Sequence, residues 1–120
     1  MNIPNTTALV SVFENCNNLI TISPIEAGNC TNILSMFDNC ISLEIGRLNN
    51  IGNSINPDYP EWNYLDYSDC SLSTISERES IYQGLANIST SGFTLYVSMP
   101  ASIGEDDSIA TNKGWVVNHI

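Results

Sequence analysis

A repeated segment in the first half of the chain constrains the fold more than any other feature of the sequence. Residues 7–22 align with residues 31–46 at a constant offset of 24, and both copies contain Phe, an acidic residue, Asn, Cys, two variable residues and Leu. Apolar residues at helical spacing precede the cysteine in each copy, which predicts a short helical turn that leads through Asn into a strand. A unit of this length cannot bury its own apolar face, so consecutive units must stack.

Stacking brings equivalent residues of the two copies into register. The strands expected at residues 19–22 and 43–45 then lie side by side in a parallel sheet. We expect a structural ladder in the interior, and the cysteines in it are interpreted as core residues rather than as a redox pair. The ladder consists of Phe13, Cys16 and Leu19 from the first copy and Phe37, Cys40 and Leu43 from the second.

Beyond Leu48 the repeat loosens, and other helix and strand signals take its place. A divergent third unit is expected at residues 47–67, without the Phe or the Asn-Cys pair, and its Leu65 follows Leu43 by 22 residues. Residues 70–120 are expected to form capping units that begin with a capping box at Thr74 and Glu77. The elements expected after Leu48 are a strand at 62–67, an amphipathic helix at 74–89 with Ile81, Tyr82, Leu85 and Ile88 on its apolar face, a strand at 93–97, a helical turn at 107–112 closed by Gly114, and a strand at 115–117.

These signals together predict an α/β fold in one domain over residues 1–120. We expect a short solenoid with a parallel sheet of about five strands on one face and short helices or turns on the other. At 120 residues and 42% hydrophobic composition, the chain is large enough for one continuous core.

The charge balance excludes two classes of partner. Three Lys and Arg residues against 13 Asp and Glu give a net charge of -10, which repels nucleic acid and anionic membrane surfaces. No apolar run approaches the roughly 20 residues of a spanning helix, and no secretory leader is recognised, so membrane insertion is not expected.

Residues with catalytic or metal-binding chemistry are sparse. The only histidine, His119, stands near the end of the sequence, which disfavours a nucleophilic triad. The acidic triplet 105–107 lacks calcium-loop spacing and is interpreted as favouring the start of a helical turn, so no metal or cofactor is predicted. Glycan hydrolysis by Asp58, Glu61, Asp66 and Asp69 is kept as a weaker alternative. The four cysteines, Cys16, Cys30, Cys40 and Cys70, lack zinc spacing and are interpreted as buried thiols, with two disulfides as the alternative.

Surface recognition is the function that these exclusions leave. Strand residues between inward-pointing apolar positions face outward and form a rigid contact surface. The candidate binding residues on this exposed sheet face are Thr21, Glu44, Asp66, Thr94, Tyr96 and Asn118.

Two segments resemble known repeat proteins. Residues 7–46, with an aromatic residue followed by Asn-Cys and a spaced Leu, resemble the BspA-type leucine-rich repeats of bacterial surface proteins. The segment from Cys70-Ser71-Leu72-Ser73 to Ile109-Ala110-Thr111-Asn112-Lys113-Gly114-Trp115 is similar to the closing segment of leucine-rich-repeat proteins in bacteriophage tail fibres and other virion proteins. Met99-Pro100 departs from the small, glycine-rich turn usual there.

The resemblance implies a leucine-rich-repeat fold used for attachment, with no catalytic residues to carry over. We therefore expect a non-enzymatic protein-binding module, a bacteriophage virion protein associated with tail fibres or decorating the capsid surface. Its partners would be other virion proteins or a host-surface protein or glycan, and a homo-oligomer is left open. A leucine-rich-repeat fragment of an adhesin at the bacterial cell surface is the alternative.

Overall fold

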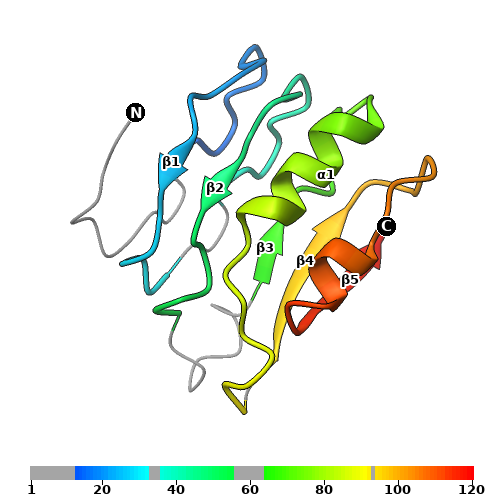
Figure 1. The fold of residues 1–120 in the computed structure, drawn as a ribbon. Helices are drawn as coiled ribbons and strands as arrows, with labels where there is room; N and C mark the ends of the chain where they lie inside the picture. Colours follow the sequence, from blue (N-terminus) through cyan, green and yellow to red (C-terminus); the bar gives the residue numbers. More distant parts are fainter. Residues whose placement is uncertain (1–12, 33–35, 56–63, 93) are drawn as a thin grey trace.

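In the part of the chain that the structure describes, two parallel sheets and two helices are present. The computed structural model describes residues 13–32, 36–55, 64–92 and 94–120. Figure 1 shows β1 to β5 arranged side by side in chain order, with α1 in front of β3 and α2 in front of β5. The elements are β1 (Ile25–Glu26), β2 (Leu48–Asn49), β3 (Tyr64–Asp66), α1 (Ile75–Gly84), β4 (Leu95–Met99), α2 (Ser108–Thr111) and β5 (Trp115–His119).

The strands form a two-stranded sheet, β1-β2, and a three-stranded sheet, β3-β4-β5, instead of the single sheet expected. The segments predicted as the first two strands contribute only an isolated parallel bridge between Thr21 and Ile45, and β1 and β2 follow a few residues later. Pro24 separates the bridge from β1, and because proline has no N–H to donate, the ladder is interrupted there.

The two repeats lie against each other in the predicted register. The rings of Phe13 and Phe37 stack with centroids 5.8 Å apart, and the N–H of Phe13 donates to the carbonyl of Met36. Within each copy, the cysteine N–H donates to the carbonyl of the phenylalanine at 3.1 Å, so the part from Phe to Cys is a hydrogen-bonded turn. The start of each expected helical segment lies outside the described residues. In the structure, Phe37, Cys40 and Leu43 are buried, while Phe13, Cys16 and Leu19 are partly buried against the same core.

A third copy of this turn is present, where the sequence predicted none. Tyr67 stacks on Phe37 with centroids 4.8 Å apart, and the N–H of Cys70 donates to the carbonyl of Tyr67 as in the other two turns. The third copy therefore follows the second by 30 residues, with Tyr in place of Phe. Leu65, which we aligned with Leu43, instead pairs with Val97 between β3 and β4.

Helix α1 begins where the capping box predicts and ends earlier than expected. Thr74 is the N-cap, and its hydroxyl accepts the N–H of Glu77. Of the predicted apolar face, only Ile81 and Tyr82 lie on the helix, where both are buried, whereas Leu85 and Ile88 are buried beyond its end. The helix stops at Gly84 because the next residues turn extended: Leu85 forms a parallel bridge with Ile51, and Ala86 donates to the Ile51 carbonyl.

The C-terminal elements agree with the prediction apart from their bounds. Helix α2 lies within the expected turn, and Gly114 follows it with φ +92°, a conformation that favours glycine. Strands β4 and β5 each continue two residues beyond the predicted ends. One apolar cluster from Ile22 to Trp115 connects all these elements. Among the described residues, no helix is long and apolar enough to span a membrane.

Candidate binding surface on the three-stranded sheet

The three-stranded sheet buries one face and leaves the other partly exposed. Leu65, Leu95, Val97 and Trp115 point into the core, as the alternation of side chains along a strand requires. The opposite parity places Tyr64, Tyr96 and Val116 in one row across the three strands. The rings of Tyr64 and Tyr96 stack with centroids 5.3 Å apart at 15°, and Tyr64 and Val116 are 43% and 39% exposed.

A polar row lies beside this apolar one. Asp66, Ser98 and Asn118 are aligned in register, one strand each. The carboxylate of Asp66 accepts the N–H of Ser68 at 2.8 Å, and the buried hydroxyl of Ser98 has no hydrogen-bond partner among the described residues. We call the residues Tyr64, Asp66, Thr94, Tyr96, Val116 and Asn118 the outer sheet face.

Four of the six predicted binding residues belong to the outer sheet face, and two do not. Thr21 is exposed but lies at the isolated bridge to Ile45, outside the three-stranded sheet. The carboxylate of Glu44 accepts hydrogen bonds from the N–H and the hydroxyl of Ser73, which follows the third turn. Both residues come after a Phe-to-Cys turn, whereas Asp66 precedes one, so the six residues do not share one face. Tyr64 was not among the predicted binding residues. Because side chains alternate along a strand, the inward-pointing Leu65 next to it implies that Tyr64 faces outward.

A second group of polar residues lies where β4 and β5 end. Arg78 and Glu105 form a buried ion pair at 2.7 Å, and Arg78 also donates to the carbonyls of Leu72, Pro100 and Ala101. Next to it, the carboxylate of Asp107 accepts from the hydroxyl of Tyr82 at 2.9 Å and contacts His119 at 2.8 Å. We call Arg78, Tyr82, Glu105, Asp107 and His119 the C-terminal polar network.

Three titratable groups of this network have shifted pKa values, and burial together with the hydrogen bond to Asp107 raises the pKa of Tyr82 well above its usual value. Burial raises the pKa of Glu105, but hydrogen bonds from Arg78, the N–H of Ile103 and Ser102 outweigh it and lower the pKa to about 2. Burial lowers the pKa of His119, yet the Pro100 carbonyl and the Asp107 carboxylate raise it above its usual 6.5. Because both ring nitrogens face acceptors, the protonated imidazole makes both hydrogen bonds at once.

The network contains metal-ligating residue types, with one donor atom each of Glu105, Asp107 and His119 within 4.8 Å of one another. Glu105 is already bound by Arg78 and Ser102, and Asp107 by Tyr82 and His119, so these groups satisfy one another. The triplet 105–107 directly precedes α2, as predicted, and Asp107 is the N-cap residue, but only the Asp106 side chain bonds to the helix start, accepting the N–H and hydroxyl of Ser108. The carboxylates of Glu105 and Asp107 turn toward the network instead.

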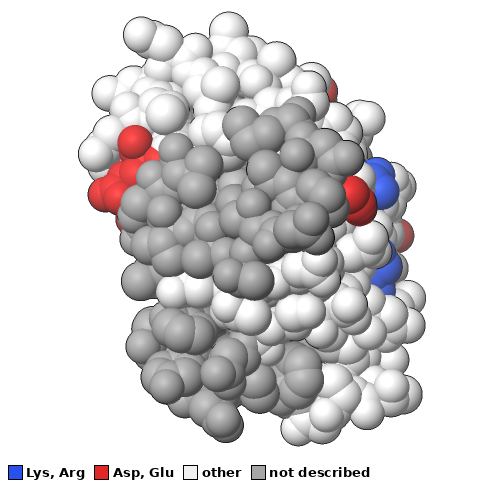
Figure 2. Space-filling model, turned by 90° about the vertical axis from the view of Figure 1, so that its left-hand side faces the viewer, with Lys and Arg blue, Asp and Glu red and all other residues white. Residues whose placement is uncertain are grey.

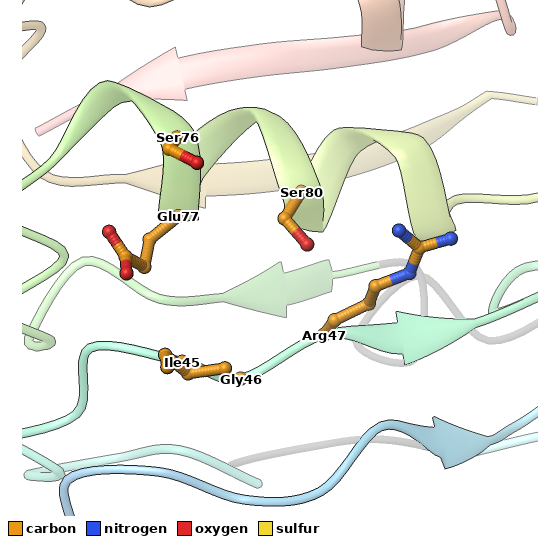
Figure 3. A pocket seen from close by; sticks show the side chains of 6 residues that line it. All are labelled: Ile45, Gly46, Arg47, Ser76, Glu77 and Ser80. Atoms are coloured by element: carbon orange, nitrogen blue, oxygen red, sulfur yellow. The ribbon is translucent and has the colours of Figure 1, made fainter.

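A small pocket opens between the first half of α1 and the segment before β2 (Figure 3). Its volume is about 180 Å³, and one carboxylate oxygen of Glu77 is buried without a hydrogen-bond partner among the described residues. Pockets for small molecules have volumes of roughly 300–1,000 Å³, so this one has room for a few waters or a small group. The lining residues are Ile45, Gly46, Arg47, Ser76, Glu77 and Ser80.

The acidic residues considered for glycan hydrolysis have structural partners where they are described. Asp66 accepts the N–H of Ser68, and Asp69 accepts the N–H of Asn39, so each carboxylate holds a turn. Asp58 and Glu61 lie outside the described residues.

None of the four cysteines forms a disulfide in the described structure, and Cys30, Cys40 and Cys70 are buried. The thiol of Cys40 donates to the carbonyl of Phe13 at 2.8 Å, which links the first two turns. Burial and neighbouring charges raise the pKa of Cys70 to about 12, so this thiol is unreactive as a nucleophile at neutral pH.

No family model matches the chain, and no curated protein or solved structure matches it significantly. The comparisons therefore suggest no function for this chain.

Proposed function

We propose that this protein is a short leucine-rich-repeat solenoid that acts as a non-enzymatic binding module, and that it docks on another macromolecule through the outer sheet face. The stacked Tyr64–Tyr96 pair is the observation that carries the proposal. Tyrosine offers a large contact area with few rotatable bonds, and tyrosines are enriched in protein interfaces. A sheet packed on a continuous core holds both rings in place before a partner arrives.

The solenoid interpretation is supported by the three stacked turns. Phe13, Phe37 and Tyr67 form a continuous aromatic stack. Backbone hydrogen bonds connect the first turn to the second, and the Asp69 carboxylate of the third turn accepts the N–H of Asn39 in the second. This is the arrangement that repeat proteins use, since each unit contacts only its neighbours.

We place the module in a bacteriophage virion, where it would be associated with tail fibres or decorate the capsid surface. The support is the similarity of the segment from Cys70 to Trp115 to the closing segment of virion leucine-rich-repeat proteins. Its partner would be another virion protein or a host-surface protein or glycan.

Mass spectrometry of purified phage particles tests this proposal. We expect the protein in the particles, and we expect the double variant Tyr64→Ser/Tyr96→Ser to be incorporated about tenfold less or worse, because hot-spot aromatic residues each contribute 2 kcal/mol or more to an interface. The control is Ile20→Ser/Ile41→Ser, which removes two exposed apolar residues outside the outer sheet face. Absence of the wild-type protein from particles would contradict the virion assignment.

A bacterial surface adhesin is the second candidate, because residues 7–46 resemble BspA-type repeats. Recovery of the protein in the cell-surface fraction of an uninfected bacterium would select it. Glycan hydrolysis stays a weaker alternative, which would require a measured activity that the double variant Asp66→Asn/Asp69→Asn loses.

A further inference from the structure

The few cations of the chain are all engaged within the fold. Arg78 is buried in the ion pair with Glu105, and Lys113 donates to three carbonyls at the end of α1, those of Tyr82, Gln83 and Leu85. Arg47 donates to the side chain of Asn49. These are all the Lys and Arg residues in the sequence, and none of the partners just named belongs to the outer sheet face.

Carboxylates lie beside the outer sheet face without a compensating Lys or Arg among the described residues. Asp66 belongs to that face, and Asp69 is exposed on the turn that follows β3. Asp69 accepts the N–H of Asn39, which places Asp38 next to it. We call Asp38, Asp66 and Asp69 the acidic ridge. From the side where β1 lies, Figure 2 shows basic side chains along one margin only, while the acidic side chains at the opposite margin have no basic neighbour in view.

The stacked tyrosines of this face, Tyr64 exposed and Tyr96 half-buried, add a second reason for a cationic partner. The face of an aromatic ring carries partial negative charge, so Lys and Arg side chains are attracted to it. An arginine at this surface would therefore find carboxylates on the ridge and aromatic rings in the adjacent row. A second copy of the chain is disfavoured, since each copy has a charge of -10 and would bring an acidic surface against another.

We infer that the outer sheet face docks a protein surface rich in arginine and lysine, whose cations pair with the acidic ridge while its neighbouring side chains pack on Tyr64, Tyr96 and Val116. This inference rests on the proposed function, in which the same face is the docking surface, and it adds the chemistry of the partner. A neutral glycan would use the tyrosines but would gain nothing from the ridge.

The test uses a nona-arginine peptide as the probe and a nona-citrulline peptide, which is nearly isosteric and uncharged, as its control. We expect nona-arginine alone to bind the intact chain. Its affinity should fall about tenfold or more when NaCl rises from about 50 mM to about 500 mM, because salt screens the charges at an exposed interface. In NMR spectra of the labelled protein, the largest shifts should fall on the outer sheet face and the acidic ridge. Equal binding of both peptides, or shifts spread evenly over all acidic residues, would overturn the inference.

Two double variants that remove the same charge distinguish binding at the acidic ridge from attraction to the overall negative charge of the chain. We expect Asp66→Asn/Asp69→Asn to weaken nona-arginine binding about tenfold, and Glu26→Gln/Glu79→Gln, which removes the same charge elsewhere, to weaken it less than about threefold. The asparagine and glutamine oxygens can still accept the backbone and side-chain hydrogen bonds that these carboxylates accept in the fold. Equal effects of the two pairs would contradict a site at the ridge.

Particle incorporation separates the two proposals. If incorporation depends on the tyrosines but not on Asp66 and Asp69, the module is a virion component and the cationic partner is wrong. If the protein is absent from particles yet binds nona-arginine at the mapped face, the virion assignment fails and the docking chemistry stands.

Discussion

Two asparagines at equivalent repeat positions adopt a backbone conformation that most residues avoid. Asn15 and Asn39 have φ values of 63° and 59°, in the left-handed region where asparagine is tolerated better than most other non-glycine residues. The side-chain amide of Asn39 donates to that of Asn15 at 2.8 Å, so the same residue type shapes the turn and connects it to its neighbour. This accounts for asparagine before the cysteine in both copies.

Substitution of Asn39 separates these two roles. We expect Asn39→Ala to lower the free energy of unfolding by about 1–2 kcal/mol, because it loses a side-chain hydrogen bond and places alanine in the left-handed region. Asn39→Gly loses the hydrogen bond but accepts the backbone conformation, so its loss should be smaller. Urea denaturation of both variants measures the difference, and a larger loss for glycine would contradict the account.

The C-terminal polar network loses stability both at acidic pH and at alkaline pH. Glu105 has a pKa lowered from 4.5 to about 2, so its stabilisation is present above about pH 4.5 and is lost as the pH falls toward 2. His119 has a raised pKa, so its stabilisation is complete below about pH 6.5 and is lost as the pH rises through the folded-state pKa. We therefore expect the urea midpoint to be highest between about pH 4.5 and pH 6.5.

The variant His119→Gln tests whether His119 causes the loss of stability above about pH 6.5. It should flatten the decline above about pH 6.5 while leaving the decline below pH 4.5 in place. An unchanged alkaline limb in the variant would show that another group causes it.

At the scale of elements, the close approach of α1 to β2 depends on Gly84. A β-carbon at this position would lie 2.5 Å from the carbonyl oxygen of Leu48, while the Gly84 carbonyl accepts the N–H of Asn50. In most helices Gly→Ala is stabilising by up to about 1 kcal/mol. Here we expect Gly84→Ala to be destabilising by about 2 kcal/mol, because the helix must move away from the strand.

The neighbouring variant Gln83→Ala is the control for helix propensity. Gln83 is exposed on the same helix turn, and the substitution should change the free energy of unfolding by less than about 0.5 kcal/mol. Stabilisation by Gly84→Ala would mean that α1 and β2 do not meet as described.

Elements were predictable where local signals decided them. The Phe13 and Phe37 turns repeat the same residue types, and the capping box at Thr74 marked the start of α1. The third turn was missed because it comes 30 residues after the second instead of 24, and because Tyr67 replaces Phe. The end of α1 is set by the pairing of Leu85 with Ile51, 34 positions earlier, which no local pattern reveals.

The candidate surfaces were also only partly predictable from local sequence patterns. Alternation along β4 identified Tyr96, but only the strand register shows that Tyr64 stacks on it. The C-terminal polar network joins Arg78 to Glu105 and Asp107 to His119, which are 27 and 12 residues apart, through the packing of helices against strand ends. Spacing in the sequence cannot indicate such contacts.

At the scale of the whole molecule, the charge of the chain is nearly uncompensated. Two ion pairs involve its carboxylates among the described residues, one with Arg78 and one with His119, while the sequence has 13 Asp and Glu residues. Folding brings the remaining carboxylates closer together than they are in the unfolded chain, so their mutual repulsion opposes the folded state.

Added salt should therefore stabilise the protein. We expect the free energy of unfolding at pH 7 to rise by about 1 kcal/mol between about 20 mM and about 500 mM NaCl, because screening weakens repulsion between exposed charges. The buried pair of Arg78 and Glu105 is screened much less, so its contribution persists. Glu14→Lys, at an exposed position of the first turn, should be more stable than the wild type at low salt and respond less to NaCl. If the unfolding midpoint of the wild type fell as NaCl rose, attraction rather than repulsion would dominate its surface, and the uncompensated acidic ridge would be excluded.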